Sequence, residues 1–212
     1  MSYTSRIVGK AAPLQIENLD TDQIMPKQFL RGIDKSGLKE GLLYNLRFDS
    51  QGTPRSDFVL NQEAYSDATI IISGANFGCG SSREHAVWGM LQYGIRAIVA
   101  PSFGEIFYSN AMNNRLLLVT VPETTIGQLI ADASQPLAEP FDIDIETQRL
   151  RTHSLDLPFE IIPRHRRMLL EGLDSIGLSL TYQEDISAFA RSHWAEQPWL
   201  RDVAKEVYGR LN

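Results

Sequence analysis

The segment from residue 68 to residue 121 constrains the fold most, because short apolar runs in it alternate with stretches of helical periodicity. Buried strands are expected at residues 68–73, 96–100 and 116–121, where aliphatic residues follow one another. Between these strands, residues 83–94 and 102–114 carry apolar side chains at helical spacing. Such an order implies right-handed crossovers, so the segment predicts an α/β fold with a parallel βαβαβ core. Ligand-binding loops are expected at the carboxyl ends of its strands.

Residues at the ends of these elements support the assignment. Gly94 is placed where a helix C-cap is expected. Ser102 followed by Glu105 three residues later predicts a capping box at the start of the second helix. The amino-terminal third is rich in turn formers, so loops and short strands are expected there.

The rest of the chain is less regular. Residues 141–152 alternate apolar and polar side chains, as a strand with one exposed face does, and residues 164–172 predict a helix that ends at Gly172. The tail, residues 184–208, carries aromatic residues at helical intervals, including Trp194. These aromatic residues are expected in a core or in subunit contacts.

Composition excludes several classes of function. At 212 residues and 43% hydrophobic composition, the chain is long enough for one domain with an elaborated tail. Its formal net charge of −6 gives no reason to expect a nucleic-acid partner. No stretch approaches the roughly 20 apolar residues that span a membrane, and no secretory leader is apparent, so a cytoplasmic protein is expected.

Metal-binding residues are sparse. The single cysteine, Cys79, excludes an intrachain disulfide and cannot alone provide the thiolates that hold an iron–sulfur cluster. The four histidines, His85, His153, His165 and His193, form none of the close pairs that mark zinc sites. No metal is therefore expected on this chain.

The loop that follows the strand at 68–73 carries the clearest chemical signal. Gly78 and Gly80 allow positive φ and close approach of a ligand, while Ser81 and Ser82 come just before the helix begins. A helix N-terminus attracts anions through its unpaired N–H groups, and Arg83 adds a planar fork that binds a carboxylate in a bidentate manner. The combination predicts a carboxylate-binding site.

Three familiar motifs fail at this loop. The dinucleotide-binding pattern would require glycine where Arg83 stands, and the hydrolase elbow would require glycine at Glu84. A phosphate-binding P-loop would require lysine where Gly80 stands. From spacing alone, a glycine-rich turn before an ordinary helix is an equally good interpretation.

Four blocks of sequence, in consistent order between residues 5 and 183, change that balance. They read NLDTDQIMPKQFL, GCGSSREHA, RAIVAPSFGEIF and GLDSIGLSL. Together they resemble the small subunits of bacterial isopropylmalate isomerases, relatives of aconitase. The resemblance implies a swivelling β/β/α domain of the aconitase type over residues 1–183, with residues 184–212 as its helical C-terminal extension.

The resemblance also implies an activity. Members of this family are hydro-lyases that interconvert 2-isopropylmalate and 3-isopropylmalate in leucine biosynthesis, by dehydration and rehydration. Ser81 matches the serine that removes a proton from carbon, and Ser82 and Arg83 match substrate-binding positions. A [4Fe-4S] cluster is expected on a separate large subunit, which would be the partner of this chain in a heterodimer or larger heteromer.

Residues near the amino terminus receive roles by the same resemblance. Asp22 matches an aspartate close to the active site and is expected to orient a catalytic group, whereas Asp20 is expected only to shape its turn. Phe29 and Leu30 lie in the loop that sets side-chain specificity and are expected to meet the isopropyl group. Arg31 is assigned no role.

His85 lies one helical turn beyond Ser81, where a supporting hydrogen bond or helix contact is favoured over direct catalysis. Cys79 is expected to be a small packed residue. Two other functions stay open. One is a small subunit that acts on another 2-hydroxy diacid, such as citramalate, dimethylmalate or homocitrate. The other is an anion-binding module without catalysis.

Overall fold

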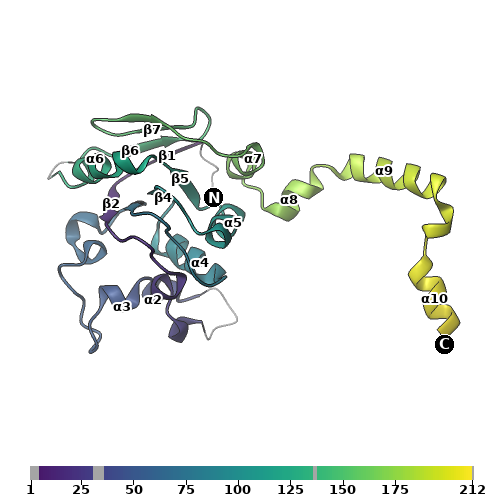
Figure 1. The fold of residues 1–212 in the computed structure, drawn as a ribbon, viewed down its shortest axis with the longest axis horizontal. Helices are drawn as coiled ribbons and strands as arrows, with labels where there is room; N and C mark the ends of the chain where they lie inside the picture. The colour runs from purple at the N-terminus through teal and green to yellow at the C-terminus, as the bar shows by residue number, and fades with distance from the viewer. Residues whose placement is uncertain (1–4, 31–35, 136–137, 212) are drawn as a thin grey trace. The chain divides into compact units, whose positions relative to one another are not determined.

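The computed structural model describes residues 5–30, 36–135 and 138–211, and Figure 1 shows its ribbon. Contacts divide the chain into two compact units, Met1–Asp174 and Ser175–Asn212. This division falls before the one expected from the sequence, between residues 183 and 184.

A four-stranded parallel sheet forms the centre of the first unit. Its strands run in the order β2 (Ala11–Leu14), β3 (Ile70–Ser73), β4 (Ala97–Ala100) and β5 (Leu117–Thr120). The three strands predicted from the sequence are confirmed, and β3 and β4 are fully buried. The prediction omitted β2, which contains Pro13; proline is tolerated because β2 lies at the edge of the sheet.

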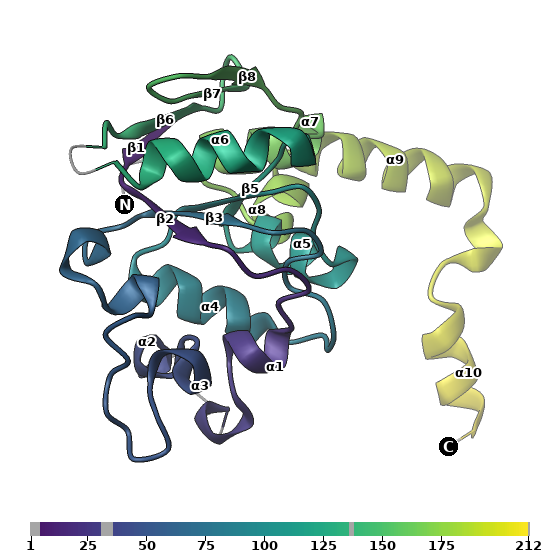
Figure 2. The ribbon, with the colours of Figure 1, turned by 60° about the vertical axis from the view of Figure 1, so that its left-hand side comes forward.

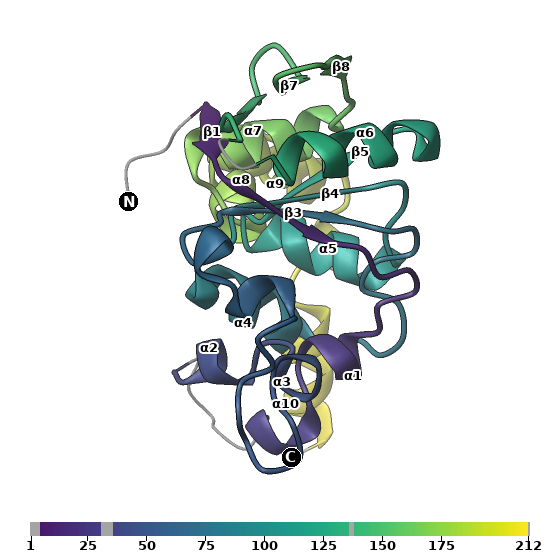
Figure 3. The ribbon, with the colours of Figure 1, turned by 90° about the vertical axis from the view of Figure 1, so that its left-hand side faces the viewer.

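Helices cover both faces of this sheet. Figures 2 and 3 show α6 (Glu123–Ala133) on one face, with α4 (Glu84–Tyr93) and α5 (Glu105–Asn113) on the other. Gly94 ends α4 with φ of 115°, as predicted. Helix α6 was not predicted, although the apolar spacing from Ile126 to Ala133 was a usable signal. The α/β class and its parallel βαβαβ core are confirmed.

The predicted capping box at the start of α5 is wrong. The helix begins at Glu105 with Gly104 at the N-cap and without a side-chain cap. The hydroxyl of Ser102 instead accepts a hydrogen bond from the backbone N–H of Asn76, at 2.8 Å. Ser102 therefore joins two loops rather than capping a helix.

A second sheet is antiparallel, in the order β1 (Arg6–Gly9), β6 (Phe141–Asp144), β7 (Arg149–Arg151) and β8 (Asp156–Pro158). The single strand predicted at residues 141–152 is a hairpin, with Gln148 at φ of 53° in the turn. On β6, buried residues alternate with partly exposed ones.

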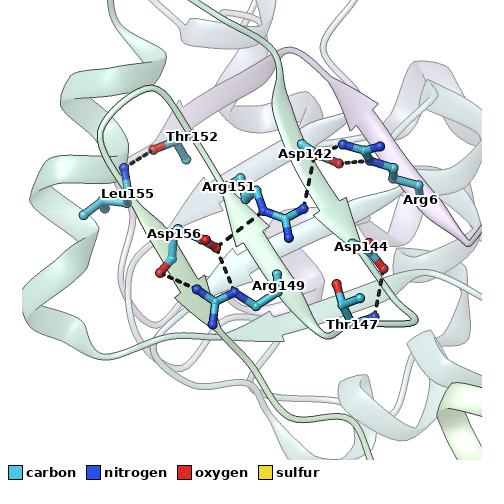
Figure 4. Close-up of polar contacts among 9 residues, drawn as sticks. All are labelled: Arg6, Asp142, Asp144, Thr147, Arg149, Arg151, Thr152, Leu155 and Asp156. Carbon is cyan, nitrogen blue, oxygen red and sulfur yellow. Dashed lines mark hydrogen bonds and ion pairs between the residues drawn. The ribbon is translucent and has the colours of Figure 1, made fainter.

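The exposed face of this sheet carries a row of opposite charges, which Figure 4 shows. Arg6 and Arg151 both contact Asp142, and Arg149 donates to Asp156 at 2.8 Å. The hydrogen bond from Arg6 and its positive charge lower the pKa of Asp142 despite the carboxyl's partial burial. Because the charges compensate one another across strands, this face offers no concentrated charge to a ligand.

Short helical segments lie between β2 and β3, separated by turns and loops. They are α1 (Thr21–Ile24), η1 (Lys27–Phe29), α2 (Leu38–Gly41), α3 (Tyr44–Arg47), η2 (Val59–Asn61) and η3 (Glu63–Tyr65). Helix α7 (Pro163–Glu171) ends at Gly172 with φ of 67°, as predicted.

The second unit is helical. It contains α8 (Ser175–Leu180), α9 (Gln183–Glu196), η4 (Pro198–Leu200) and α10 (Val203–Leu211). None of the residues of α9 is buried, and Trp199 and Tyr208 are each 70% exposed. The structure thus places these aromatic side chains in no core, and subunit contact stays a prediction. Among the described residues, no helix combines the length and apolar character needed to cross a membrane.

Asp132 ties α6 to the turn between β7 and β8. The residue is 2% exposed, and its carboxylate accepts hydrogen bonds from the hydroxyls of Thr152 (2.5 Å) and Ser154 (2.7 Å) and from the Gln128 amide (3.2 Å). Burial alone would raise the pKa of Asp132, but these hydrogen bonds outweigh it and the pKa is lowered. The ionised carboxylate is therefore the form that stabilises the fold.

We expect Asp132→Asn to lower the free energy of unfolding at pH 7 by about 1–3 kcal/mol, because it weakens several hydrogen bonds to a buried charge. A carboxyl whose folded pKa is lowered stabilises above its unfolded pKa of about 3.9, and this contribution disappears as pH falls through the folded pKa. Urea unfolding at pH 7 and pH 3 should thus show a smaller cost at pH 3. An equal cost at both values, or an equal cost for the exposed control Glu160→Gln, would contradict the assignment.

Candidate active site

Loops that follow three neighbouring strands are hydrogen-bonded to one another at the carboxyl ends of the parallel sheet. Between the loops after β2 and β3, the N–H of Gly78 donates to the carbonyl of Leu19 at 2.7 Å. Between the loops after β3 and β4, the N–H of Phe77 donates to the carbonyl of Ser102 at 3.1 Å, and the N–H of Gly104 donates to the carbonyl of Phe77 at 2.9 Å. The loop at 74–83 is therefore held on both sides.

Both glycines of this loop have the positive φ that the sequence predicts, 75° for Gly78 and 90° for Gly80. A Cβ at Gly78 would lie 2.3 Å from the ring of Phe107 on α5. A Cβ at Gly80 would lie 2.7 Å from the carboxylate of Asp20. Each glycine thus allows close packing within this chain, at one place against a ring and at the other against a carboxylate.

Ser81 and Ser82 are both exposed, although Gly78 just before them is buried. The N–H of Arg83 donates to the carbonyl of Ser81 at 2.8 Å, which closes a tight turn. Helix α4 begins at Glu84 with Arg83 at the N-cap, so neither serine caps the helix. The Ser81 side chain therefore faces solvent and stays available to a ligand.

Arg83 forms an ion pair with Asp22, in which Nη1 and Oδ1 are 2.5 Å apart. The arginine side chain is 16% exposed and the aspartate side chain 40% exposed. The fold thus brings together two residues that the sequence had singled out separately. A guanidinium has five N–H donors, so this contact leaves capacity for a second carboxylate.

The start of α4 is also fixed to the end of α5. The carboxylate of Glu84 accepts a hydrogen bond from the Asn114 side-chain amide at 2.6 Å, and the Asn114 oxygen accepts one from the Trp88 indole at 3.0 Å. The ring of His85 lies against that of Trp88, with centroids 4.7 Å apart. His85 is therefore placed by packing, and its supporting role stays a prediction.

Comparison with known proteins identifies this arrangement. The family model described as the aconitase C-terminal domain matches residues 1–124. The 3-isopropylmalate dehydratase small subunit 1 of Chromobacterium violaceum is 57% identical over 211 residues, which is 100% of both chains. The chain belongs to the family of 3-isopropylmalate dehydratase small subunits.

Other members of the family are similar over most of their length. The small subunit of Rhodospirillum centenum is 48% identical over 91% of this chain and 96% of its own. A crystal structure of a 3-isopropylmalate dehydratase from Methanocaldococcus jannaschii is similar with a TM-score of 0.61 and 26% sequence identity, over 86% of this chain and 98% of that one. The family and the fold expected from the four sequence blocks are thus confirmed.

The residues expected to contact the substrate side chain lie in the short helix η1 and just after it. Phe29 is half-buried, and its ring centroid is 5.0 Å from that of Tyr44. Phe29 also packs so closely on Gly41 that a Cβ there would lie 2.5 Å from its ring. Leu30 is half-buried at the end of η1. Arg31 lies outside the described residues.

Two residues of this site were assigned no role from the sequence. Asn114 bonds to both Glu84 and Trp88, and Thr21 donates its hydroxyl to the carbonyl of Ser81 at 2.9 Å. The place of Thr21 between two aspartates was the only sequence signal for it. Asp20, by contrast, caps α1 through its carboxylate, in agreement with the structural role expected for it.

Metal ligands are scarce in the part of the chain that the structure describes. It contains no group of three or more His, Cys, Asp or Glu residues arranged to hold a metal ion. The thiol of Cys79 lies 3.3 Å from the carbonyl of Asn18, so it is engaged in the loop. The described residues do not fit an iron–sulfur cluster.

We expect Gly78→Ala to destabilise the first unit by about 1–3 kcal/mol more than Gly94→Ala does. Both glycines have positive φ, so both variants carry backbone strain, but no atom lies within 4 Å of a Cβ at Gly94. The difference in urea unfolding free energies therefore isolates the clash with Phe107. Equal losses in the two variants would show that the close packing of Gly78 is unimportant.

Proposed function

We propose that this chain is the small subunit of a hydro-lyase that interconverts 2-isopropylmalate and 3-isopropylmalate, and that Ser81 is its catalytic base. The observation that carries the assignment of Ser81 is its exposed position in a turn fixed next to Arg83. Membership of the family supports the substrate, and the geometry of the loop supports the role of the residue.

In the proposed reaction, Arg83 binds a substrate carboxylate, and the hydroxyl of Ser82 contributes to binding the substrate. Ser81, acting as an alkoxide, takes the proton from the carbon next to the carbinol. The C–H electron pair becomes the second bond of an alkene, and the carbinol oxygen departs with the pair of the C–O bond. Hydroxide then adds at the carbon that lost the proton, and Ser81 returns its proton to the carbon that lost the hydroxyl, which leaves Ser81 as an alkoxide again. A serine alkoxide needs nearby positive charge, which Arg83 and the N-terminus of α4 provide.

A separate large subunit completes the proposed enzyme. One cysteine cannot supply the thiolates of a cluster, so the [4Fe-4S] group belongs to that partner in this proposal. When bound, it supplies a Lewis acid for the departing hydroxyl. The unpaired Cys79 and such a cluster both fit a reducing compartment, so we place the enzyme in the cytoplasm.

The residues next to the turn suit a diacid rather than a phosphate ester. Among the described residues, the turn at residues 78–83 carries one guanidinium, that of Arg83, which is already in contact with the Asp22 carboxylate. A planar carboxylate matches the remaining donors of Arg83 in a bidentate arrangement. Leu30 then provides the apolar surface proposed to contact the isopropyl group.

We expect Ser81→Ala to lower kcat by about 10²–10⁴-fold, because a general base contributes that much. KM should change little and the heteromer should remain intact, since the side chain is exposed and fills no core. Steady-state hydration of isopropylmaleate by the purified heteromer measures both constants. The exposed serine Ser134, mutated to alanine, serves as the control.

Retention of kcat within about threefold in an intact Ser81→Ala heteromer would remove Ser81 from the chemistry. In that case a small subunit that only binds the anion, with catalysis elsewhere, becomes the better description.

Leu30→Asn tests the substrate assignment. We expect kcat/KM for isopropylmalate to fall about 10–200-fold, because contact with an apolar group of this size contributes roughly that factor. The corresponding value for citramalate, which carries a methyl group, should fall much less. Parallel assays of both substrates give the ratio, and an equal loss for both would contradict a role for Leu30 in specificity.

A further inference from the structure

Three consecutive residues at the start of α1, residues 20–22, contact the turn at residues 79–83, which carries Ser81. The carboxylate of Asp20 lies against Gly80, Thr21 contacts the residues on either side of that glycine, and Asp22 pairs with Arg83. An isolated parallel bridge between Asp20 and Cys79 sets the register of the two segments. One short stretch of backbone thus spans the whole turn.

Thr21 makes the two most direct contacts of this stretch. Its N–H donates to the carbonyl of Cys79 at 2.9 Å, and its hydroxyl donates to the carbonyl of Ser81 at 2.9 Å. The threonine is 1% exposed, so both hydrogen bonds are shielded from water. Because Gly80 between the two carbonyls can adopt many conformations, these bonds decide which one it keeps.

Helix α1 is itself rigid at this end. The Asp20 carboxylate accepts a hydrogen bond from the N–H of Asp22, and Gln23 Oε1 accepts one from the N–H of Asp20 at 3.0 Å. This reciprocal capping box fixes the first turn of the helix, and with it the position of Thr21. The exposed turn is therefore supported by a buried residue, Thr21, whose position is fixed by local hydrogen bonds.

We propose that Thr21 is a positioning residue for the reaction: its buried hydroxyl fixes the Ser81 peptide and so aims the Ser81 side chain at the substrate. The inference rests on the proposed role of Ser81. A misplacement of the order of 1 Å costs about 10²-fold in rate, so a single hydrogen bond to this peptide has a measurable effect on turnover.

Two variants separate the hydroxyl from the shape of the side chain. Thr21→Val keeps the shape and removes the donor, whereas Thr21→Ser keeps the donor. We expect kcat of the heteromer to fall about 10–100-fold in T21V with KM changed less than threefold, and T21S to recover most of the loss. The matched control is Thr69→Val, because the Thr69 hydroxyl is also buried but has no hydrogen-bond partner among the described residues.

A double-mutant cycle tests whether Thr21 acts through Ser81. In the Ser81→Ala background, T21V should cause no further loss of kcat, because the group that it positions is gone. A full additional loss in that background would overturn the proposal, as would an unchanged kcat in T21V. If T21V does not assemble, Thr21→Ala is measured in the same cycle under conditions in which the heteromer is intact.

The outcomes distinguish this inference from the function on which it rests. Loss of turnover in S81A without any effect of T21V leaves the function in place and removes Thr21 from it. Full turnover in S81A removes the catalytic role of Ser81 on which the inference rests. A uniform fall in heteromer stability without a specific fall in kcat would assign Thr21 to folding alone.

Discussion

The close packing of Gly78 on Phe107 is the contact on which the geometry of the site depends. With no Cβ at this position, the loop after β3 lies directly on the ring, and Gly78 is buried while Ser81 is exposed. Protein interiors resist added volume, so this contact fixes the position of the loop relative to α5. The turn at residues 79–83 therefore starts from a backbone position that is held by the core.

Hydrogen bonds between neighbouring loops then hold the residues that follow Gly78 in place. The parallel strands end at the same edge of the sheet, and their loops continue the parallel pairing through the bridges Asp20 with Cys79 and Phe77 with Phe103. The ion pair between Arg83 and Asp22 joins a mostly buried guanidinium to a partly exposed carboxylate. Its effect is to orient the guanidinium, since both side chains come from backbone that is already held.

The sequence predicted those features that depend on neighbours in the chain. The apolar runs at β3, β4 and β5, the C-cap at Gly94 and the positive φ of Gly78 and Gly80 all follow from local chemistry. The capping box at Ser102 was wrong because a distant N–H, that of Asn76, engages its hydroxyl.

Contacts between segments far apart in the chain could not be predicted in the same way. The pairing of Asp22 with Arg83 and the hydrogen bond from Thr21 to Ser81 join residues that only the order of the strands brings together. The hairpin at β6 and β7 was missed for a different reason: Leu150 is out of phase with the apolar residues of β6, and this signal of a turn between them was not used.

The proposed active site is divided between two subunits, which explains why so much of this chain's structure supports one turn. In the proposed enzyme, the proton acceptor and the guanidinium that binds the carboxylate come from this chain, while the Lewis acid comes from another. Two halves of a site that meet at a subunit boundary cannot rely on a shared backbone for their alignment. Each half must be ordered before they meet, because ordering it during assembly would cost conformational entropy in every closed state. Thr21, Asp22 and Phe107 provide that order within this chain.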